Sequence, residues 1–172
     1  MRGCAWCLLC LSVAADTGRR LNYAMTDSNI FTARDAWLSN PTAAEATYGH
    51  ISTWDTSGVT NMYRLFCARS GWHLCNTAAA SFNDDISAWD TSAVTTTRST
   101  FNQASSFNRP IGNWNIGAVT EMRYMFHYAS AFDQDLGWCV DDDVDLENAF
   151  VNAPCASTSC GVTQGSCTRR NF

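Results

Sequence analysis

The chain has 172 residues, of which 46% are hydrophobic and 16% charged, with a net charge of −5 and a pI of about 4.9. This length and composition indicate one globular domain. The acidic balance argues against nucleic acid as a partner, because phosphate binding needs a basic face. All positive charges come from arginine, and because these residues are scattered along the sequence, dedicated anion recognition is not expected.

The first fifteen residues, MRGCAWCLLCLSVAA, have the features of a secretory signal peptide. Arg2 gives a positive start, an apolar run follows, and Ala15 supplies a small residue before the cleavage point. The run is too short to span a bilayer, and no other segment is long and apolar enough. We therefore expect a signal peptide over 1–15, an extracellular or cell-surface location and no transmembrane span. The alternative is an ordinary buried N-terminal segment.

Residues 16–47 are expected to form an N-terminal capping region built on a helix over 29–38. Asp27 or Ser28 can satisfy the free N–H groups at its start, and Pro41 ends it. The apolar stripe of this helix contains Ile30, Ala33 and Trp37.

Four tryptophans begin similar phrases along the rest of the chain. The phrases read WDTSGVTNMYRLF, WDTSAVTTTRSTF, WNIGAVTEMRYMF and WCVDDDVDLENAF, at steps of 35, 25 and 24 residues. A fixed period of this size is typical of stacked-repeat solenoids. The longer first step comes from an insertion over 67–78, and the last copy lacks one residue before its tryptophan. The tryptophans are Trp54, Trp89, Trp114 and Trp138.

Within each copy the sequence predicts a short strand followed by a short helical turn. The strand is expected in segments such as DDISAWD. Val119, Met122 and Phe126 have the i, i+3, i+7 spacing of one helix face. Thr97 replaces the methionine of this pattern in the second copy, which would leave that coil under-packed or let its hydroxyl bond to a neighbouring coil.

The phrases FNDDISAWDTSAVT and WDTSGVTNM resemble the BspA-like surface-protein repeat, a domain-of-unknown-function family in the leucine-rich-repeat group, over about 46–153. The resemblance implies a secreted or surface-displayed protein used in adhesion or recognition, and it brings no catalytic residues. It also implies an α+β fold: a right-handed, leucine-rich-repeat-like solenoid of about four coils over 48–153, each a short strand plus a short helical turn.

Six cysteines remain after the expected cleavage, and an even number in an exported chain predicts three disulfides. Cys67 and Cys75 lie at the base of the insertion and are expected to pair. The other four are expected to stabilise a Cys-rich C-terminal cap or tail over 154–172, with their pairing left open. These four are Cys139, Cys155, Cys160 and Cys167.

No cofactor and no metal are expected. His73 lies between Cys67 and Cys75, so a Cys-His-Cys site is conceivable, but a disulfide explains the same cysteines more simply. The acidic run 141–143 lacks the glycine spacing of a calcium loop. No nucleophile elbow and no phosphate-binding glycine loop is present, so an enzyme is not expected. A hydrolase, or an ice-binding array on Thr60, Thr95 and Thr120, remains a minor alternative.

The insertion supplies the candidate ligand-binding loop, with Arg69, Trp72 and His73. Insertions in repeat proteins often form the binding face, and Arg and Trp are enriched at contact hot spots. We therefore expect a non-enzymatic recognition or adhesion scaffold for an unknown protein or glycan. The alternatives are that Trp72 folds back over Phe66, and that the chain is a structural wall or matrix protein without a specific ligand.

Overall fold

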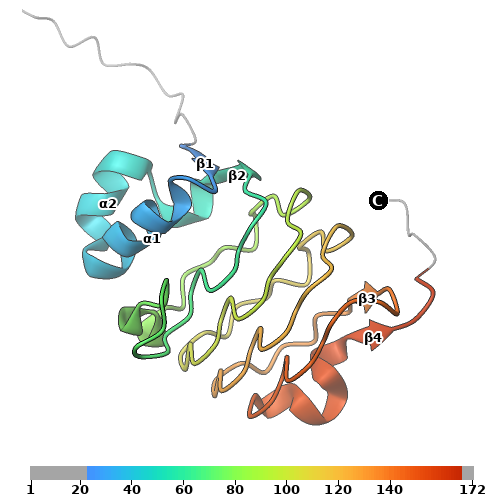
Figure 1. The fold of residues 1–172 in the computed structure, drawn as a ribbon. Helices are drawn as coiled ribbons and strands as arrows, with labels where there is room; N and C mark the ends of the chain where they lie inside the picture. Colours follow the sequence, from blue (N-terminus) through green and yellow to red (C-terminus); the bar gives the residue numbers. More distant parts are fainter. Residues whose placement is uncertain (1–22, 168–172) are drawn as a thin grey trace, which may run out of the picture.

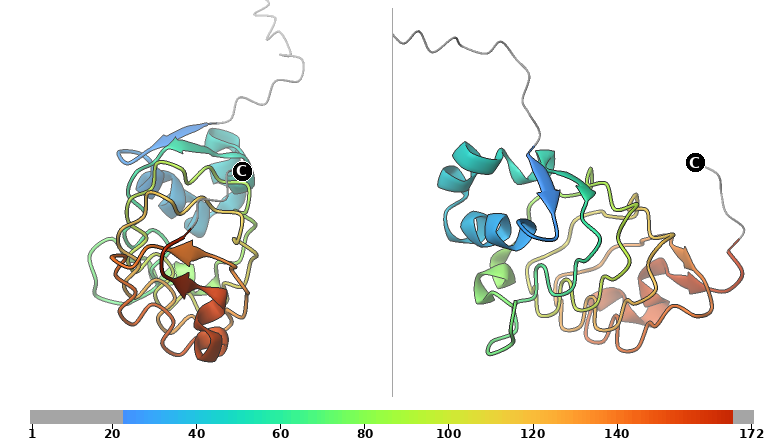
Figure 2. Two further views of the ribbon diagram at one scale, coloured as in Figure 1. Left: turned by 90° about the vertical axis from the view of Figure 1, so that its right-hand side faces the viewer. Right: turned by 45° about the horizontal axis from the view of Figure 1, so that its top comes forward.

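The computed structural model describes residues 23–167, so the expected signal peptide over 1–15 lies outside the described residues. Its strands form two small parallel sheets at opposite ends of the molecule (Figure 1). The helices α1 and α2 lie beside the first sheet, and the 3-10 helix η3 lies beside the second (Figure 2). The strands are β1 (Ala24–Thr26), paired with β2 (Asp55–Gly58), and β3 (Cys139–Val140), paired with β4 (Thr163–Gln164).

The helix expected over 29–38 is present as α1 (Ile30–Ser39), and its apolar stripe is buried. The expected cap is wrong. The N-cap residue is Asn29, which makes no side-chain capping bond. Asp27 instead accepts a hydrogen bond of 2.8 Å from the backbone N–H of Thr60, so its carboxylate joins the N-terminal region to the rest of the chain.

A second helix, α2 (Pro41–Tyr48), follows directly and was not expected. Pro41 ends α1 but also begins α2, because proline is well accommodated at the first helical position, where its missing N–H has no intrahelical partner. The Asn40 side chain caps the new helix by accepting a 3.1 Å hydrogen bond from the Ala43 N–H. The 3-10 helices η1 (Ile51–Thr53), η2 (Thr77–Ser81) and η3 (Pro154–Gly161) complete the helical elements of the described residues.

The expected right-handed, leucine-rich-repeat-like solenoid of strand-plus-helix coils is wrong. Residues 23–167 contain only the helices and the two two-stranded sheets named above. We call the four tryptophan phrases, 54–66, 89–101, 114–126 and 138–150, the Trp segments. They consist mainly of turns, with strand only at β2 and β3.

The helical turns are absent because the second half of each Trp segment contains a residue with positive φ. Such a residue ends any right-handed helix and is instead required at the third position of a type II β-turn. In the first segment the Leu65 N–H donates to the Met62 carbonyl at 3.1 Å, which closes a turn around Arg64. The φ angles are 62° at Arg64, 56° at Ser99, 58° at Tyr124 and 56° at Asn148.

The strand expected in the DDISAWD segment, residues 84–90, is absent, and neighbouring Trp segments pair at other positions. Isolated parallel bridges join Asn61 to Thr96, Thr96 to Glu121, and Glu121 to Asp145. Beyond each bridge, the N–H groups of alternate residues donate to the next segment. The first segment shows the pattern, with bonds of 3.1 Å from Met62 to Thr96, 3.0 Å from Arg64 to Arg98 and 2.7 Å from Phe66 to Thr100.

The aromatic side chains of successive Trp segments stack on one another in the core. The indole rings of Trp54 and Trp89 are 5.9 Å apart, and those of Trp89 and Trp114 are 6.5 Å apart with an interplanar angle of 1°. Phe66 and Phe101 stack in the same way at 5.7 Å. These rings are almost fully buried and belong to one hydrophobic cluster, so burial of their apolar area contributes strongly to stability.

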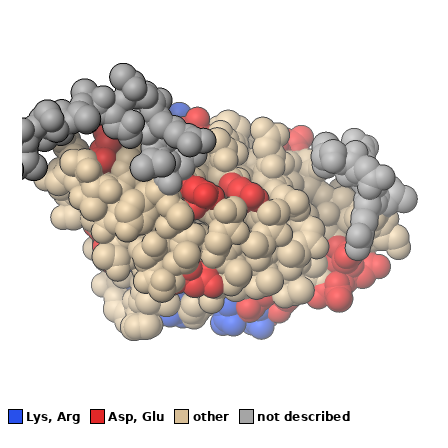
Figure 3. All heavy atoms as spheres, turned by 90° about the horizontal axis from the view of Figure 1, so that it is seen from above, with Lys and Arg blue, Asp and Glu red and all other residues tan. Residues whose placement is uncertain are grey.

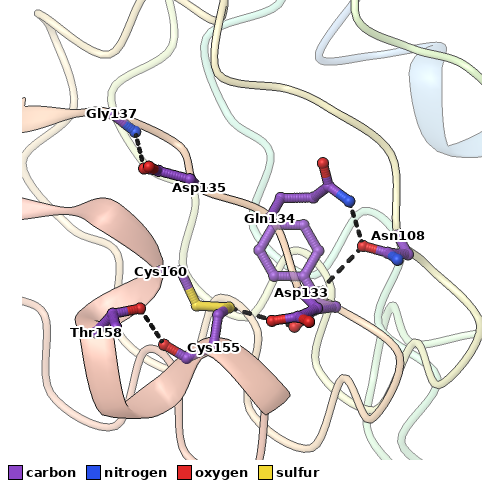
Figure 4. The surroundings of a disulfide bond; sticks show 9 residues. Asn108, Asp133, Gln134, Asp135, Gly137, Cys155, Thr158 and Cys160 are labelled. Atoms are coloured by element: carbon purple, nitrogen blue, oxygen red, sulfur yellow. Dashed lines mark hydrogen bonds between the residues drawn. A yellow bond between two sulfur atoms is a disulfide. The ribbon is translucent and has the colours of Figure 1, made fainter.

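The C-terminal end is closed by η3, β4 and two disulfides, Cys139–Cys167 and Cys155–Cys160. In Figure 4 the Asn108 side-chain oxygen accepts hydrogen bonds from the N–H of Asp133 at 3.1 Å and the amide of Gln134 at 2.6 Å. These bonds connect the loop before the third Trp segment to the loop after it, which lies beside the Cys155–Cys160 disulfide.

Candidate functional site

The insertion loop is held rigidly at its base. The expected disulfides are present in the structure, and one of them joins Cys67 to Cys75 with a Cα–Cα distance of 4.7 Å. The Asn76 N–H also donates to the Cys67 carbonyl at 2.8 Å. From α1, the buried guanidinium of Arg34 donates to the Leu74 carbonyl at 3.1 Å. The loop is therefore fixed both by a covalent bond and by the N-terminal helix.

Trp72 lies at the centre of this loop, against two arginines. The guanidinium carbon of Arg69 is 3.9 Å from the Trp72 ring centroid, and that of Arg64 is 4.3 Å away. Arg64 also donates from Nη1 to the His73 carbonyl at 3.1 Å. A guanidinium at this distance from an aromatic ring is attracted by the ring quadrupole. The loop thus presents a cation–π cluster, which we define as Arg64, Arg69 and Trp72.

The alternative position of Trp72, folded back over Phe66, is not the one observed. Phe66 contacts other rings, with centroid distances of 4.0 Å to Phe82, 5.7 Å to Phe101 and 5.9 Å to Trp89. The space around Phe66 is filled by the core. Trp72 is therefore left partly exposed on the loop.

An open pocket of about 420 Å3 lies between the insertion loop and α1. Arg69 lines it, whereas Trp72 and His73 do not. The helix contributes Phe31, Arg34 and Asp35, and the loop contributes Arg69, Ser70, Gly71, Leu74, Cys75, Asn76 and Thr77. The structure thus brings Arg69 and Trp72 together at the edge of a pocket and leaves the exposed His73 side chain beside it.

Some of the described arginines are paired with a carboxylate, and others are not. Arg34 pairs with Asp35 at 2.8 Å, Arg98 pairs with Glu121 at 2.9 Å, and Arg123 pairs with Asp145 and Glu147. Within residues 23–167, no carboxylate oxygen lies within 4 Å of the guanidinium of Arg64 or Arg69. Figure 3 shows most of the basic side chains in view along one edge of the molecule, beside acidic ones.

His127 adds a titratable group near the cluster. Burial, and then the positive charge of Arg69, lower the pKa of His127 below its ordinary value of 6.5. Its ring packs edge-on against Tyr128 at 4.5 Å and Tyr124 at 5.3 Å. His127 is therefore mainly neutral at pH 7, and it leaves the two arginines as the positive groups of this surface.

The sequence did not indicate that Arg64, or the α1 residues that line the pocket, belong to the candidate site. Arg64 lies 8 residues before Trp72 in the first Trp segment, where nothing in the repeated pattern marks it as part of the loop. The Arg64 side chain reaches the insertion, where it donates to the His73 carbonyl. Phe31 and Asp35 were predicted only as parts of a capping helix. No signal in the sequence indicated that α1 would pack against residues 69–77.

The other constellations considered from the sequence give no grouped site in the described part of the chain. No three His, Cys, Asp or Glu side chains between residues 23 and 167 are arranged to hold a metal ion. Thr60 is held by Asp27, and the Thr95 and Thr120 hydroxyls each donate to the carbonyl of the preceding threonine in the series. These threonines therefore act as local partners of the backbone.

Two further observations concern location. The three disulfides are consistent with an extracellular environment. Among the helices in residues 23–167, none has the length and apolar character needed to cross a membrane.

Comparison with known proteins gives one family match. No curated protein and no solved structure matches the chain. The family described as "Mycoplasma protein of unknown function, DUF285" matches residues 39–161, which include α2, all four Trp segments and the insertion loop. The match covers most of the chain, and the chain belongs to the DUF285 family.

Proposed function

We propose that the chain is a secreted or cell-surface, BspA-like repeat protein that acts as a non-enzymatic recognition scaffold for a protein or glycan. The family match and the recurring phrases around Trp54, Trp89 and Trp114 support the BspA-like assignment. The disulfides support export, because such bonds persist in oxidising compartments.

The observation that carries the proposal is the contact of Trp72 with both Arg64 and Arg69, at 4.3 and 3.9 Å. Trp and Arg are the residue types that most often dominate binding energy at interfaces. The disulfide Cys67–Cys75 and the bond from Arg64 to the His73 carbonyl hold the cluster in place before any ligand arrives. A preformed site loses less conformational entropy on binding, so a rigid loop is well suited to recognition.

The proposal is tested with the secreted full chain on a glycan array and on immobilised extracellular-matrix proteins. We expect the wild-type protein to bind a member of one panel. The triple variant Arg69→Ala, Trp72→Ala, His73→Ala should bind that member at least about 10-fold more weakly, equivalent to 1.4 kcal/mol. The control variant Arg109→Ala changes an exposed arginine outside the loop and should bind normally. Equal binding by the triple variant, or no binding by the wild type to either panel, contradicts the proposal.

A further inference from the structure

Arg64 and Arg69, the two arginines of the cation–π cluster, differ from the other described arginines in how their positive charge is balanced. Three of the described arginines have carboxylate partners, and a fourth, Arg109, donates to the Asn83 carbonyl at 2.6 Å and lies outside the loop. Arg64 and Arg69 instead converge on one indole ring. Two positive charges beside the same ring, neither paired with a carboxylate of the described residues, would both interact favourably with a bound anion. The arginines are scattered in the sequence, but the fold brings Arg64 and Arg69 to the same ring.

We propose that Arg64 and Arg69 bind the carboxylate or sulfate of an acidic glycan, whose sugar ring occupies the adjoining pocket. This inference rests on the proposed function, because it names the ligand class of the same loop.

The geometry of the two guanidinium groups suits an oxyanion. An arginine that stacks on an aromatic ring keeps the N–H groups at its edge available, and these donors match the two oxygens of a carboxylate or sulfate. The bond from Arg64 to the His73 carbonyl uses one donor and fixes the orientation of the rest. Because the Arg64 guanidinium is already positioned, ligand binding does not have to order this side chain.

The pocket explains why we choose a glycan over an acidic peptide. Its volume of about 420 Å3 is in the range of small-molecule sites and would take one or two sugar rings. Ser70 and Thr77 offer hydroxyl groups for sugar hydroxyls, and Phe31 offers an apolar surface for a sugar face. Asp35 in the lining is already paired with Arg34, so Arg34, on the helix side of the pocket, offers no free positive charge to a second carboxylate. A ligand with its charge at one end and neutral hydroxyls at the other therefore fits best.

The inference is tested by isothermal titration of the full chain with defined probes. Hyaluronan oligosaccharides carry carboxylates only, and chondroitin sulfate oligosaccharides carry sulfates as well. Chitin oligosaccharides are the neutral comparison and poly-glutamate is the acidic peptide comparison. We expect binding to at least one of the two acidic glycans, weaker at higher ionic strength. The better of the two identifies the preferred oxyanion.

Variants test whether the two arginines bind the anionic group. The double variant Arg64→Gln, Arg69→Gln should weaken acidic-glycan binding at least about 10-fold, whereas Arg109→Gln should leave it unchanged. The double variant Arg64→Lys, Arg69→Lys keeps the charge without the planar fork and should bind with intermediate affinity. Thermal unfolding of each variant shows whether it is folded. Arg69 is replaced in both the double and the triple variant, so the two proposals are separated by which probe binds rather than by the variants alone.

Three results would overturn the inference. These are equal binding of chitin oligosaccharides, equal or tighter binding of poly-glutamate, and unchanged acidic-glycan affinity in the folded double Gln variant. If a neutral sugar or a protein bound and the Trp72 triple variant lost that binding, the recognition function would stand while the acidic-glycan assignment fell. If nothing bound in any assay, both would fall.

Discussion

The Arg34 guanidinium in α1 donates a hydrogen bond to the backbone carbonyl of Leu65 in the first Trp segment. That carbonyl begins a column of peptide groups, because the Phe66 N–H donates to Thr100 at 2.7 Å and the Phe101 N–H donates to Met125 at 2.8 Å. Peptide dipoles aligned in this way place partial negative charge at the first carbonyl, as at the C-terminus of a helix. A buried cation at this position is therefore electrostatically favourable, and it also attaches α1 to the core.

Replacement of Arg34 should therefore destabilise the whole fold. Arg34 is 2% exposed and also bonds to Asp35 and to the Leu74 carbonyl. We expect Arg34→Met to lower the free energy of unfolding by about 3 kcal/mol, because the Leu65 and Leu74 carbonyls lose their donor and each unsatisfied buried acceptor costs about 1–3 kcal/mol. Urea denaturation measures the change, and Arg109→Met, on an exposed arginine, should alter it by less than about 0.5 kcal/mol. Equal losses in the two variants would show that Arg34 has no special role.

Gly112 should tolerate no side chain, because a Cβ atom there would lie 2.9 Å from the Leu136 carbonyl oxygen. The cause is the residue missing before Trp138. The Trp114 indole N–H donates to the Ile86 carbonyl, but the Trp138 indole N–H donates to the Gly112 carbonyl at 3.0 Å, one position further along. The two backbones therefore approach closely at Gly112, where backbone atoms cannot move aside easily.

We expect Gly112→Ala to lower the free energy of unfolding by about 1–3 kcal/mol, the usual range for overpacking. At Gly117 a Cβ would meet only the Asn115 side-chain oxygen, at 3.3 Å, and this glycine is exposed. Gly117→Ala should therefore be close to neutral. Thermal or urea unfolding compares them, and a neutral Gly112→Ala would mean that the two loops can separate without cost.

Asp27 should make stability depend on pH in the acid range. Partial burial alone would raise the pKa of Asp27, but hydrogen bonds from the Thr60 hydroxyl and from the N–H groups of Thr60 and Asn61 outweigh it and lower the pKa below 3.8. A carboxyl whose pKa is lowered by folding contributes stability that is present above its unfolded pKa and is lost as the pH falls through its folded pKa. The contribution should therefore be present at pH 6, begin to fall below about pH 4 and be lost as the pH falls through the folded pKa.

The variant Asp27→Asn should cost about 1 kcal/mol at pH 6, a value kept small by solvent screening at this exposed position. The gap between wild type and variant should be smaller at pH 3 than at pH 6. Urea denaturation at both pH values tests this. Asp142→Asn, in an exposed turn, serves as the control. A gap that is the same at pH 3 and pH 6 would assign the effect to packing rather than to the charge.

The sequence allowed the side-chain contacts of the core to be anticipated better than the backbone conformation. The recurring Trp and Phe positions do stack on their counterparts, as Trp89 does on Trp114. The apolar spacing of Val119 and Met122, however, fits both a helix face and consecutive β-turns. Arg64, Ser99 and Tyr124 are not residues that usually adopt positive φ, so nothing in their identity indicated the turns that replace the helices.

The surroundings of polar residues were also difficult to predict from the sequence. Thr97 was expected either to leave its surroundings under-packed or to bond to a neighbour. Its hydroxyl is 3.5 Å from the Glu121 carbonyl, at the limit of a hydrogen bond, and its side chain is 1% exposed. For the candidate site, Trp72 and Arg69 could be selected from the insertion, but the contribution of Arg64 and α1 depends on tertiary packing, which a single sequence does not reveal.

The disulfide Cys67–Cys75 should matter more for ligand binding than for stability. It closes a short loop, with a sequence separation of 8, so its removal by Cys67→Ala, Cys75→Ala should cost about 2 kcal/mol. The same change frees the segment that carries Arg69 and Trp72, whose ordering would then oppose binding. The matched control is Cys155→Ala, Cys160→Ala, which removes a disulfide with a sequence separation of 5 at the other end of the molecule.

We expect both pairs of substitutions to lower the unfolding temperature by similar amounts, but only the first to weaken binding of the ligand found for the wild type. Differential scanning fluorimetry and titration calorimetry on the same samples give the two quantities. Equal loss of affinity in both variants would mean that binding follows overall stability. Unchanged affinity in the Cys67→Ala, Cys75→Ala protein would show that the contacts of Arg34 with Leu74 and of Asn76 with Cys67 hold the loop without the covalent bond.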